Sequence, residues 1–403
     1  MKLSESNTPI RLGFFAAAIL LFIQQVSAAS CTGELKVSNQ LDLDKARTCK
    51  TYSGNIVIDN SGATDLKLHG VELLEGDLIV TGNDALLAFS MPTVQGVNGQ
   101  LRFANNKLLS SLDMRQLYAA RSFEVSVHPA LNELKFPAGL AEAEKITITD
   151  TTVTRVEGLK MKSAQDISIS NNIYLKSFAL ANTTSVNNVL ISANSPALHI
   201  DLGKVEGMRE ATFRNLAGLN LDGLTRVSGD MSFISNTFES LDLPSMVDIA
   251  GTLTLTDNTQ LNNLSMAKLG HLGGALSVSG NNKLTSITAF PNLQQVDGTL
   301  DITGGFDEVQ LPVLNDVRGG LNVQTTSNAF SCDTMSKLKN GVIKGNAFTC
   351  KAAVASPKSG IRNGKGGKGG SGGSDDFDSS ASINGISSLI LLGTVVLTYF
   401  TQL

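Results

Sequence analysis

The feature that most constrains the fold of this chain is an internal repeat. From position 35 to position 321 a short unit recurs fourteen times, so one unit begins about every 22 residues. In each unit two apolar residues flank one variable residue, in stretches rich in Ile, Val, Thr and Ser. Alternation with period 2 in such residues predicts a β-strand. The units are residues 35–37, 56–58, 78–80, 101–103, 123–125, 146–148, 167–169, 189–191, 211–213, 231–233, 253–255, 276–278, 300–302 and 321–323.

Each unit also has a second half, seen most clearly in residues 134–140, 241–247 and 309–314. A second apolar pair precedes a turn that often holds Pro, and another apolar position and a Gly follow. Three apolar faces per unit suit a coil filled with stacked aliphatic side chains, in which successive first strands pair in parallel about 4.8 Å apart. We therefore expect an all-β fold, a right-handed parallel β-solenoid of about 14 rungs and roughly 65 Å, as one ectodomain over residues 30–350.

An Asn follows the first strand by three residues in seven of these units. It could form a polar binding stripe, or a structural ladder in which Asn bonds the backbone of a tight corner. We expect the ladder. The pattern is weakest at His128 and at residues 150–152, where the corner Asn is missing. The seven positions are Asn83, Asn106, Asn172, Asn194, Asn236, Asn258 and Asn281.

The four cysteines lie where a solenoid needs caps for its open ends. Cys31 and Cys49 flank the first strand, and Cys332 and Cys350 follow the last. A disulfide requires Cα atoms within about 7 Å, and a long rod separates its two ends too far for pairing between them. We therefore expect the disulfides Cys31–Cys49 and Cys332–Cys350, with metal binding as the less favoured alternative.

Both ends of the chain carry processing signals. A basic start, the short apolar run 12–23 and small residues at 26–29 predict a secretory signal peptide over residues 1–29. Residues 351–379 form a Gly/Ser/Lys-rich linker. The apolar tail 389–400 is short for a membrane span and has no flanking charge, which indicates a glycolipid anchor signal. We expect attachment at Ser379, with Gly373 or Ser374 as alternatives, and removal of residues 380–403.

Composition and motif spacing exclude several kinds of chemistry. Charged residues make up 17% and the net charge is −4, so no basic excess exists to bind nucleic acid. His69, His128, His199 and His271 each lie three units apart, too far to share a metal. We expect no metal and no cofactor.

Catalytic acids are also scarce. Hydrolysis of a glycan takes two carboxylates a few ångströms apart. The variable position of the first strands holds Glu124 and Asp301, which are nine units apart. Glu210 and Asp230 occupy adjacent units, and we interpret them as surface charge. The absence of Trp argues against a platform that stacks on sugar rings.

Two sequons predict N-linked glycans, at Asn182 (Asn-Thr-Thr) and at Asn263 (Asn-Leu-Ser). Their expected place in turns of a secreted chain favours occupancy.

Several of these features together resemble one known family. They are residues 31–37 (Cys-Thr-Gly-Glu-Leu-Lys-Val), repeats such as 298–302 (Gly-Thr-Leu-Asp-Ile), the segment 241–244 (Leu-Asp-Leu-Pro), the closing segment 330–350, and the anchor signal. The sequence resembles the fungal GPI-anchored cell-wall organisation family, which includes sporulation-specific surface proteins. Its repeats are similar to the receptor L-domain type of leucine-rich solenoid. The resemblance implies a role in wall integrity, and the family has no catalytic residues to carry over.

The function expected from these observations is a non-enzymatic surface scaffold. It would sit at the outer face of the plasma membrane through its lipid, or in the wall, and would bind wall polysaccharide or mannoprotein. The alternative is an enzyme that remodels wall glucan or chitin. A pair of acids would distinguish the enzyme from the scaffold, and such pairs are nearly absent from the sequence.

Overall fold

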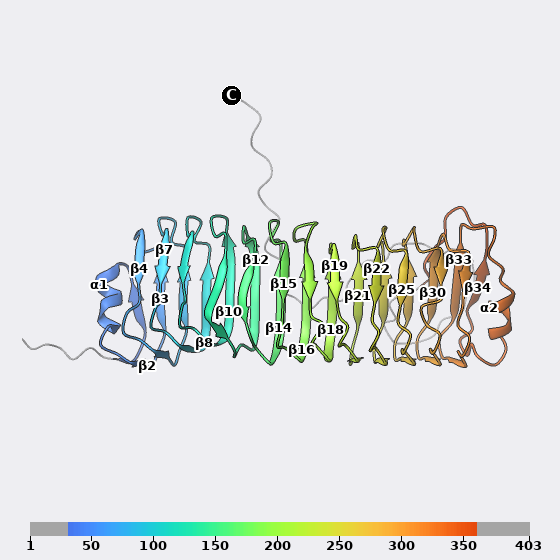
Figure 1. Cartoon of the computed structure of the whole chain (residues 1–403), viewed down its shortest axis with the longest axis horizontal. Helices are drawn as coiled ribbons and strands as arrows, with labels where there is room; N and C mark the ends of the chain where they lie inside the picture. Colours follow the sequence, from blue (N-terminus) through green and yellow to red (C-terminus); the bar gives the residue numbers. More distant parts are fainter. Residues whose placement is uncertain (1–30, 361–403) are drawn as a thin grey trace, which may run out of the picture.

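The repeating strands stack side by side along one long axis, with a short helix at each end (Figure 1). The structure is a computed structural model and describes residues 31–360. The predicted signal peptide, Ser379 and residues 380–403 lie outside the described residues. The chain forms a parallel β-solenoid of about thirteen turns, as the repeat predicts.

The long side of the solenoid contains all fourteen predicted strands. Every neighbouring pair is parallel, and the apolar positions of one turn lie beside those of the next. A further strand, β34, joins at the C-terminal end and pairs with β33. The strands are β1 (Leu35–Val37), β3 (Ile56–Asp59), β6 (Leu78–Thr81), β8 (Gly96–Ala104), β10 (Ala119–His128), β12 (Lys145–Thr151), β14 (Ser163–Ser170), β16 (Ser185–Ser192), β18 (Gly207–Arg214), β21 (Met231–Ile234), β24 (Leu253–Thr256), β27 (Leu276–Ser279), β30 (Leu300–Gly304), β33 (Leu321–Thr325) and β34 (Phe348–Lys351).

Short strands form the other two sides of each turn. The second side holds β4 (Asp65–Lys67), β7 (Ala88–Ser90), β9 (Ser111–Asp113), β11 (Leu134–Leu140), β13 (Val156–Leu159), β15 (Ser177–Ala179), β17 (His199–Asp201), β19 (Gly218–Asn220), β22 (Ser240–Asp242), β25 (Asn263–Ser265), β28 (Ser286–Ile287) and β31 (Glu308–Val309). The third side holds β2 (Thr51–Tyr52), β5 (Leu73–Leu74), β20 (Arg226–Val227), β23 (Asp248–Ile249), β26 (His271–Leu272), β29 (Gln295–Val296) and β32 (Asp316–Val317).

The core is the continuous interior of the coil. Along β21, β24 and β27 buried and half-buried residues alternate, because successive strand side chains point to opposite faces. Phe side chains also stack between turns, and the ring centroids of Phe213 and Phe233 lie 5.6 Å apart. Each turn buries its apolar faces only against its neighbours, so the turns cannot be stable singly.

The predicted Asn ladder is present and structural. All seven Asn side chains are buried, and each donates to a main-chain carbonyl on the preceding turn, such as Asn258 Nδ2 to Phe233 O at 3.0 Å. Neighbouring members also bond to each other, as Asn83 Nδ2 does to Asn106 Oδ1 at 2.9 Å. In two of the turns without Asn, His128 and Thr151 occupy the ladder position.

A second ladder, of glycines, forms the corner between the third side and the long side. A Cβ added at Gly251 would lie 2.5 Å from the carbonyl carbon of Gly229, so adjacent corners touch through their backbones. This ladder is interrupted in the middle of the rod. Three residues separate Val97 from Leu101, but only two separate Ala120 from Phe123, and four further turns keep the shorter, Gly-free spacing. There β10, β14, β16 and β18 run through the corner as single strands of 8–10 residues.

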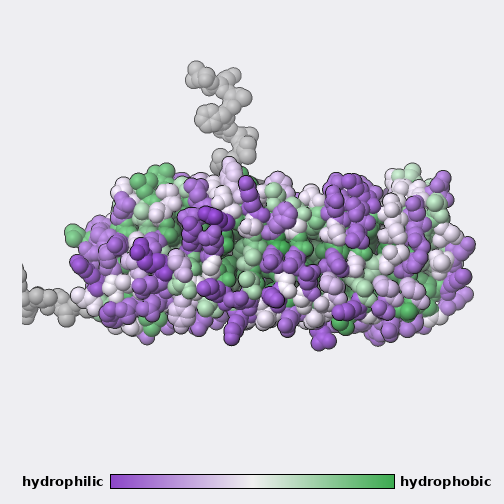
Figure 2. Space-filling view, viewed as in Figure 1, coloured by the Kyte–Doolittle hydropathy of each residue, from purple (hydrophilic) through white to green (hydrophobic). Residues whose placement is uncertain are grey.

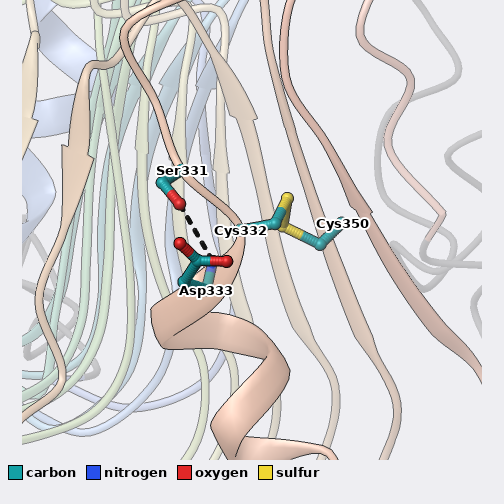
Figure 3. Close-up of a disulfide and its surroundings, with 4 residues drawn as sticks. All are labelled: Ser331, Cys332, Asp333 and Cys350. Carbon is teal, nitrogen blue, oxygen red and sulfur yellow. Dashed lines mark hydrogen bonds between the residues drawn. A yellow bond between two sulfur atoms is a disulfide. The ribbon is translucent and has the colours of Figure 1, made fainter.

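Both predicted disulfides are formed, one at each end of the rod. Cys31–Cys49 lies beside α1 (Gln40–Leu43) and the 3₁₀ helix η1 (Asp44–Ala46), with Cα atoms 5.6 Å apart. Cys332–Cys350 ties the start of α2 (Asp333–Leu338) to β34, with Cα atoms 5.9 Å apart (Figure 3). The main-chain N–H of Asp333 donates to Ser331 Oγ at 3.2 Å beside this bond. The helices cover apolar side chains that the first and last turns would otherwise expose.

Candidate binding surface

The outward face of the long side carries one unbroken row of side chains, called here the central row. The parallel register places the variable position of each strand directly beside that of the next, as the repeat predicts. Neighbouring members are therefore about 4.8 Å apart along the axis. The row consists of Lys36, Val57, Ile79, Arg102, Glu124, Thr147, Ser168, Leu190, Thr212, Ser232, Thr254, Ser277, Asp301, Asn322 and Thr349.

Hydroxyl groups dominate the middle of the central row. From Thr147 to Ser277 every member is Ser or Thr except Leu190. Within residues 31–360 none of these central-row hydroxyls bonds to another protein group, so each can donate and accept toward a ligand. Figure 2 shows polar residues spread along the whole visible length of the rod, with hydrophobic residues between them. An evenly spaced, uncharged hydroxyl surface suits hydrogen bonding to a long polyhydroxylated polymer.

Hydroxyls that lie two residues further along several of these strands were not expected from the sequence. Thr149 Oγ1 lies 3.0 Å from Ser170 Oγ, and Thr256 Oγ1 lies 3.2 Å from Ser279 Oγ. These hydroxyls bond to each other, which holds their side chains in fixed positions beside the central row. The period-2 alternation that predicts the strands could have revealed them, because these residues share the face of the central row.

The acids considered as catalytic candidates each have partners of their own. Glu124 pairs with Arg102 at 3.1 Å and also accepts from Gln100. Asp301 is buried and accepts from Asn322 Nδ2 at 2.7 Å.

Glu210 and Asp230 lie on neighbouring turns, as their sequence positions imply. Glu210 forms an ion pair with Arg209, whereas Asp230 Oδ1 accepts the main-chain N–H of Thr252 at 2.7 Å. The two carboxylates therefore make different contacts. Glu210 belongs to a surface ion pair, and Asp230 accepts a hydrogen bond at a corner of the next turn.

The four histidines lie on four separate turns, and their surroundings differ. His199 is exposed, and His69 is half-buried, where burial lowers its pKa. His128 is buried, and its burial likewise lowers its pKa. Among the described residues no group of three or more His, Cys, Asp or Glu side chains could hold a metal ion.

His271 belongs to a line of charges on the third side of the solenoid. Its Nδ1 lies 2.7 Å from Asp248 Oδ1, and its Nε2 lies 3.6 Å from Asp297 Oδ2. The hydrogen bond from Gln295, followed by the charge of Arg318 at 3.1 Å, holds the pKa of Asp297 below its usual value. These contacts join successive turns, so they hold the rod together from outside.

A groove of about 720 Å³ lies where the Gly corners stop. The strand pair β8–β10 shifts register between Ala120 and Ser122, because the corner of β10 is one residue shorter. Alanines form much of the wall, and the charged lining residues are Arg121, Glu142, Glu144, Lys160 and Lys162. In the described part of the chain none of these five charges has an ion pair. Charges of both signs line this groove, so the groove itself selects no single class of ligand.

The two sequon asparagines lie away from the central row. Asn182 is exposed in the turn between β15 and β16. Asn263 is exposed in β25 on the second side, and its Nδ2 donates to Ser240 Oγ at 3.0 Å. Glycans at these positions would leave the central row uncovered.

In the part of the chain that the structure covers, no helix is both long enough and apolar enough to cross a bilayer.

Comparison with known proteins identifies relatives over most of the chain. It is 31% identical to a cell surface GPI-anchored protein of Arthroderma benhamiae, over 83% of this chain and 86% of the relative. It is 30% identical to protein ecm33 of Aspergillus fumigatus, over 85% and 86%. It is 27% identical to sporulation-specific protein 2 of Saccharomyces cerevisiae, over 76% and 62%.

No family model matches the chain. No solved structure matches it either. The relatives nevertheless align over most of the chain, and the first of them is identical to it at 31% of the aligned residues. The chain belongs to the fungal family of GPI-anchored cell-surface and cell-wall proteins that contains Ecm33 and the sporulation-specific proteins.

Proposed function

We propose that this protein is a non-enzymatic, GPI-anchored protein of the cell surface or cell wall, which supports wall organisation by binding wall polysaccharide or mannoprotein. The central row carries the proposal. It offers Ser and Thr hydroxyls from Thr147 to Ser277 with no protein partner among residues 31–360, at a spacing set by the strands themselves. A polymer with hydroxyls along its length can form hydrogen bonds to such a row at many places. The small contributions of these bonds to the binding free energy then add up.

Binding through the central row is tested with the triple variant Ser232→Ala, Thr254→Val and Ser277→Ala. The mature protein is sedimented with insoluble wall glucan, with chitin and with mannoprotein-bearing walls. Each lost hydrogen bond weakens binding by about 0.5–1.5 kcal/mol, so we expect at least about tenfold weaker binding to one of these polymers. The matched control is Ser240→Ala with Ser286→Ala, on the second side. Equal loss in both variants, or none in the triple variant, contradicts the proposal.

The anchor is tested by phospholipase C specific for glycosylinositol lipids. We expect the enzyme to release the protein from membranes and replacement of Ser379 by a bulky residue to abolish anchoring. If the protein is already linked to the wall, glucanase treatment replaces the lipase as the release step. Retention after both treatments contradicts the anchor.

The alternative function is an enzyme that remodels glucan or chitin, and the neighbouring Glu210 and Asp230 are its only pair of acids among those considered. The test is whether the pure protein hydrolyses or transfers labelled glucan. Such activity, if it is lost in Glu210→Gln, would contradict the scaffold proposal and support the enzyme. We expect no turnover that depends on Glu210.

We also propose that Asn182 and Asn263 carry N-linked glycans. Both side chains are exposed and lie away from the central row, so they are accessible for modification. Asn182→Gln and Asn263→Gln should each remove one glycan, seen as a step in electrophoretic mobility that enzymatic deglycosylation abolishes. Unchanged mobility of either variant shows that its site is unoccupied.

A further inference from the structure

The chain does not leave the solenoid at its capped end. After β34 it turns back, and residues 352–360, called here the strap, lie across the outward face of β33 and reach β30. The main-chain N–H of Ala353 donates to Ser327 O and that of Val354 to Thr325 O, both at 2.9 Å. Two turns of the long side separate β34 from β30, so the strap runs back by about 10 Å along the axis.

Side-chain amides of β33 hold the main chain of the strap at Lys358. Asn322 Nδ2 and Gln324 Nε2 donate to the Lys358 carbonyl at 2.9 and 3.1 Å. The Lys358 N–H in turn donates to Gln324 Oε1 at 3.4 Å. Both main-chain groups of Lys358 are therefore engaged, whichever side chain stands there.

A buried carboxylate on β30 holds the end of the strap. Asp301 Oδ2 accepts from Gly360 N at 3.1 Å and from Ser359 Oγ, while its other oxygen accepts from Asn322. Asp301 is only 1% exposed, whereas Ser232, Thr254 and Ser277 in the same row are half-buried. A carboxylate is buried only with several hydrogen-bond donors around it, and two of the three donors named here belong to the strap.

The change of side-chain type in the central row coincides with the strap. From Thr212 to Ser277 every member of the row is Ser or Thr, and Asp301 and Asn322 follow where the strap lies. Pro357, Thr303 and Thr326 line one open pocket of about 340 Å³, so the strap also borders the neighbouring corner.

We propose that the strap fixes the point at which the chain leaves the body, on the outward face of β30 and two turns in from the capped end, so that the tether draws this face toward the anchor. The docking itself rests on the contacts above; its consequence for orientation rests on the proposed anchor. As a Gly/Ser-rich coil, the sequence-predicted linker up to Ser379 would have a root-mean-square span of about 24 Å. That span is well below the roughly 65 Å of the rod, so the exit point decides which surface lies nearest the membrane.

Docking is tested by limited trypsin digestion of the mature protein, followed by mass spectrometry. A protease needs the main chain of the cleaved residue free, so cleavage after Lys358 should be at least tenfold slower than cleavage after Arg362. Asp301→Ala should remove this difference, whereas Asp316→Ala, on the third side of a neighbouring turn, should keep it.

A second variant confines the change to the strap. Ser359→Ala combined with Gly360→Pro removes both strap donors to Asp301 and leaves the solenoid sequence intact, so it should expose Lys358 even if Asp301→Ala fails to fold. Equal cleavage after Lys358 and Arg362 in the wild-type protein overturns the docking. Protection that persists in the strap variant overturns the role of Asp301.

Orientation is tested on phosphatidylcholine vesicles that carry a quencher on the lipid head group. Fluorescent labels are placed at Ser232→Cys on the outward face and at Asp242→Cys on the second side of the same turn. We expect stronger quenching at position 232, and loss of the difference in the strap variant. Equal quenching in the otherwise wild-type protein overturns the orientation. Failure to attach to vesicles instead counts against the anchor, and the trypsin result is independent of it.

Discussion

Asn258 and Asn281 are joined by two hydrogen bonds to one oxygen: the main-chain N–H of Asn258 donates to Asn281 Oδ1 at 2.9 Å, and Asn258 Nδ2 donates to it at 3.1 Å. The same pair of bonds joins Asn236 to Asn258. Each ladder Asn thus satisfies the corner of the preceding turn. Hydrogen bonds between ladder Asn side chains therefore connect neighbouring turns inside the rod, alongside the packing of apolar side chains.

Removing one ladder member should therefore cost more than one bond. Asn258→Ala leaves the buried main-chain N–H of Asn236 without its acceptor, and it removes one of the two acceptors of Asn236 Nδ2 and the bond to the Phe233 carbonyl. We expect the free energy of unfolding to fall by about 2–3 kcal/mol, measured by urea denaturation. Asn262→Ala, an exposed Asn whose side chain has no hydrogen bond within the described range, is the control and should change little. Equal effects would show that the ladder contributes nothing specific.

His128 should make the protein sensitive to acid. Its Nδ1 lies 3.0 Å from Asn106 O, and among residues 31–360 its buried Nε2 has no hydrogen-bond partner. Burial lowers the pKa of His128 in the folded state, so the unfolded chain binds the extra proton more readily. The stability contributed by the neutral ring is complete above the unfolded pKa of about 6.5 and is lost as the pH falls through the folded value.

The test compares the wild-type protein with His128→Asn, which restores the ladder residue. We expect the thermal midpoint of the wild type to fall more between pH 7.5 and 4.5 than that of the variant. Carboxylates titrate in both proteins, so the difference between the two curves isolates His128. Parallel curves would contradict the prediction.

Val127 should be a point of backbone strain beside His128. Its φ is 59°, in the left-handed region that β-branched residues avoid. Asn105 and Asn171 adopt the same conformation at the same corner, with φ of 54° and 56°. Val127→Asn should stabilise the protein by about 1 kcal/mol in urea denaturation. Val247→Asn, at an exposed Val without positive φ, should give no gain; a gain there of similar size would remove the strain argument.

The Gly corners should tolerate no side chain where the turns touch. In Gly251→Ala the new Cβ would lie 2.4 Å from Asp230 Oδ1 and 2.5 Å from the Gly229 carbonyl carbon. We expect a loss of about 1–3 kcal/mol. The control is Gly207→Ala, because the nearest atom to its new Cβ is 4.0 Å away. Thermal midpoints of the two variants should differ, and equal midpoints would show that the corners have room.

Much of the fold follows from sequence spacing. Strands such as Met231–Ile234 and Leu253–Thr256 lie where the apolar alternation predicts them, and their register places the predicted variable positions side by side. The cysteine pairing is confirmed for the same reason: in a rod, each cysteine can reach only its neighbour at the same end.

Three further features of the fold were not predicted from the sequence, for different reasons. β34 lies 27 residues after the start of β33, beyond the usual spacing, because α2 intervenes. The groove follows from a corner that is one residue shorter. The strap begins in the range predicted as linker, and no local pattern marks residues 352–360 as docked.

The sequence by itself determined the solenoid and its disulfide-linked ends, because a repeat that runs along the whole rod buries the same apolar positions in every turn. Only the tertiary structure decided which polar side chains are buried in hydrogen bonds and which remain on the outward face. His and Asp are residue types usually found at the surface, so the sequence alone does not mark His128 and Asp301 as buried. They are buried because the neighbouring turn encloses one and the returning chain covers the other, and such contacts between distant residues leave no period in the sequence.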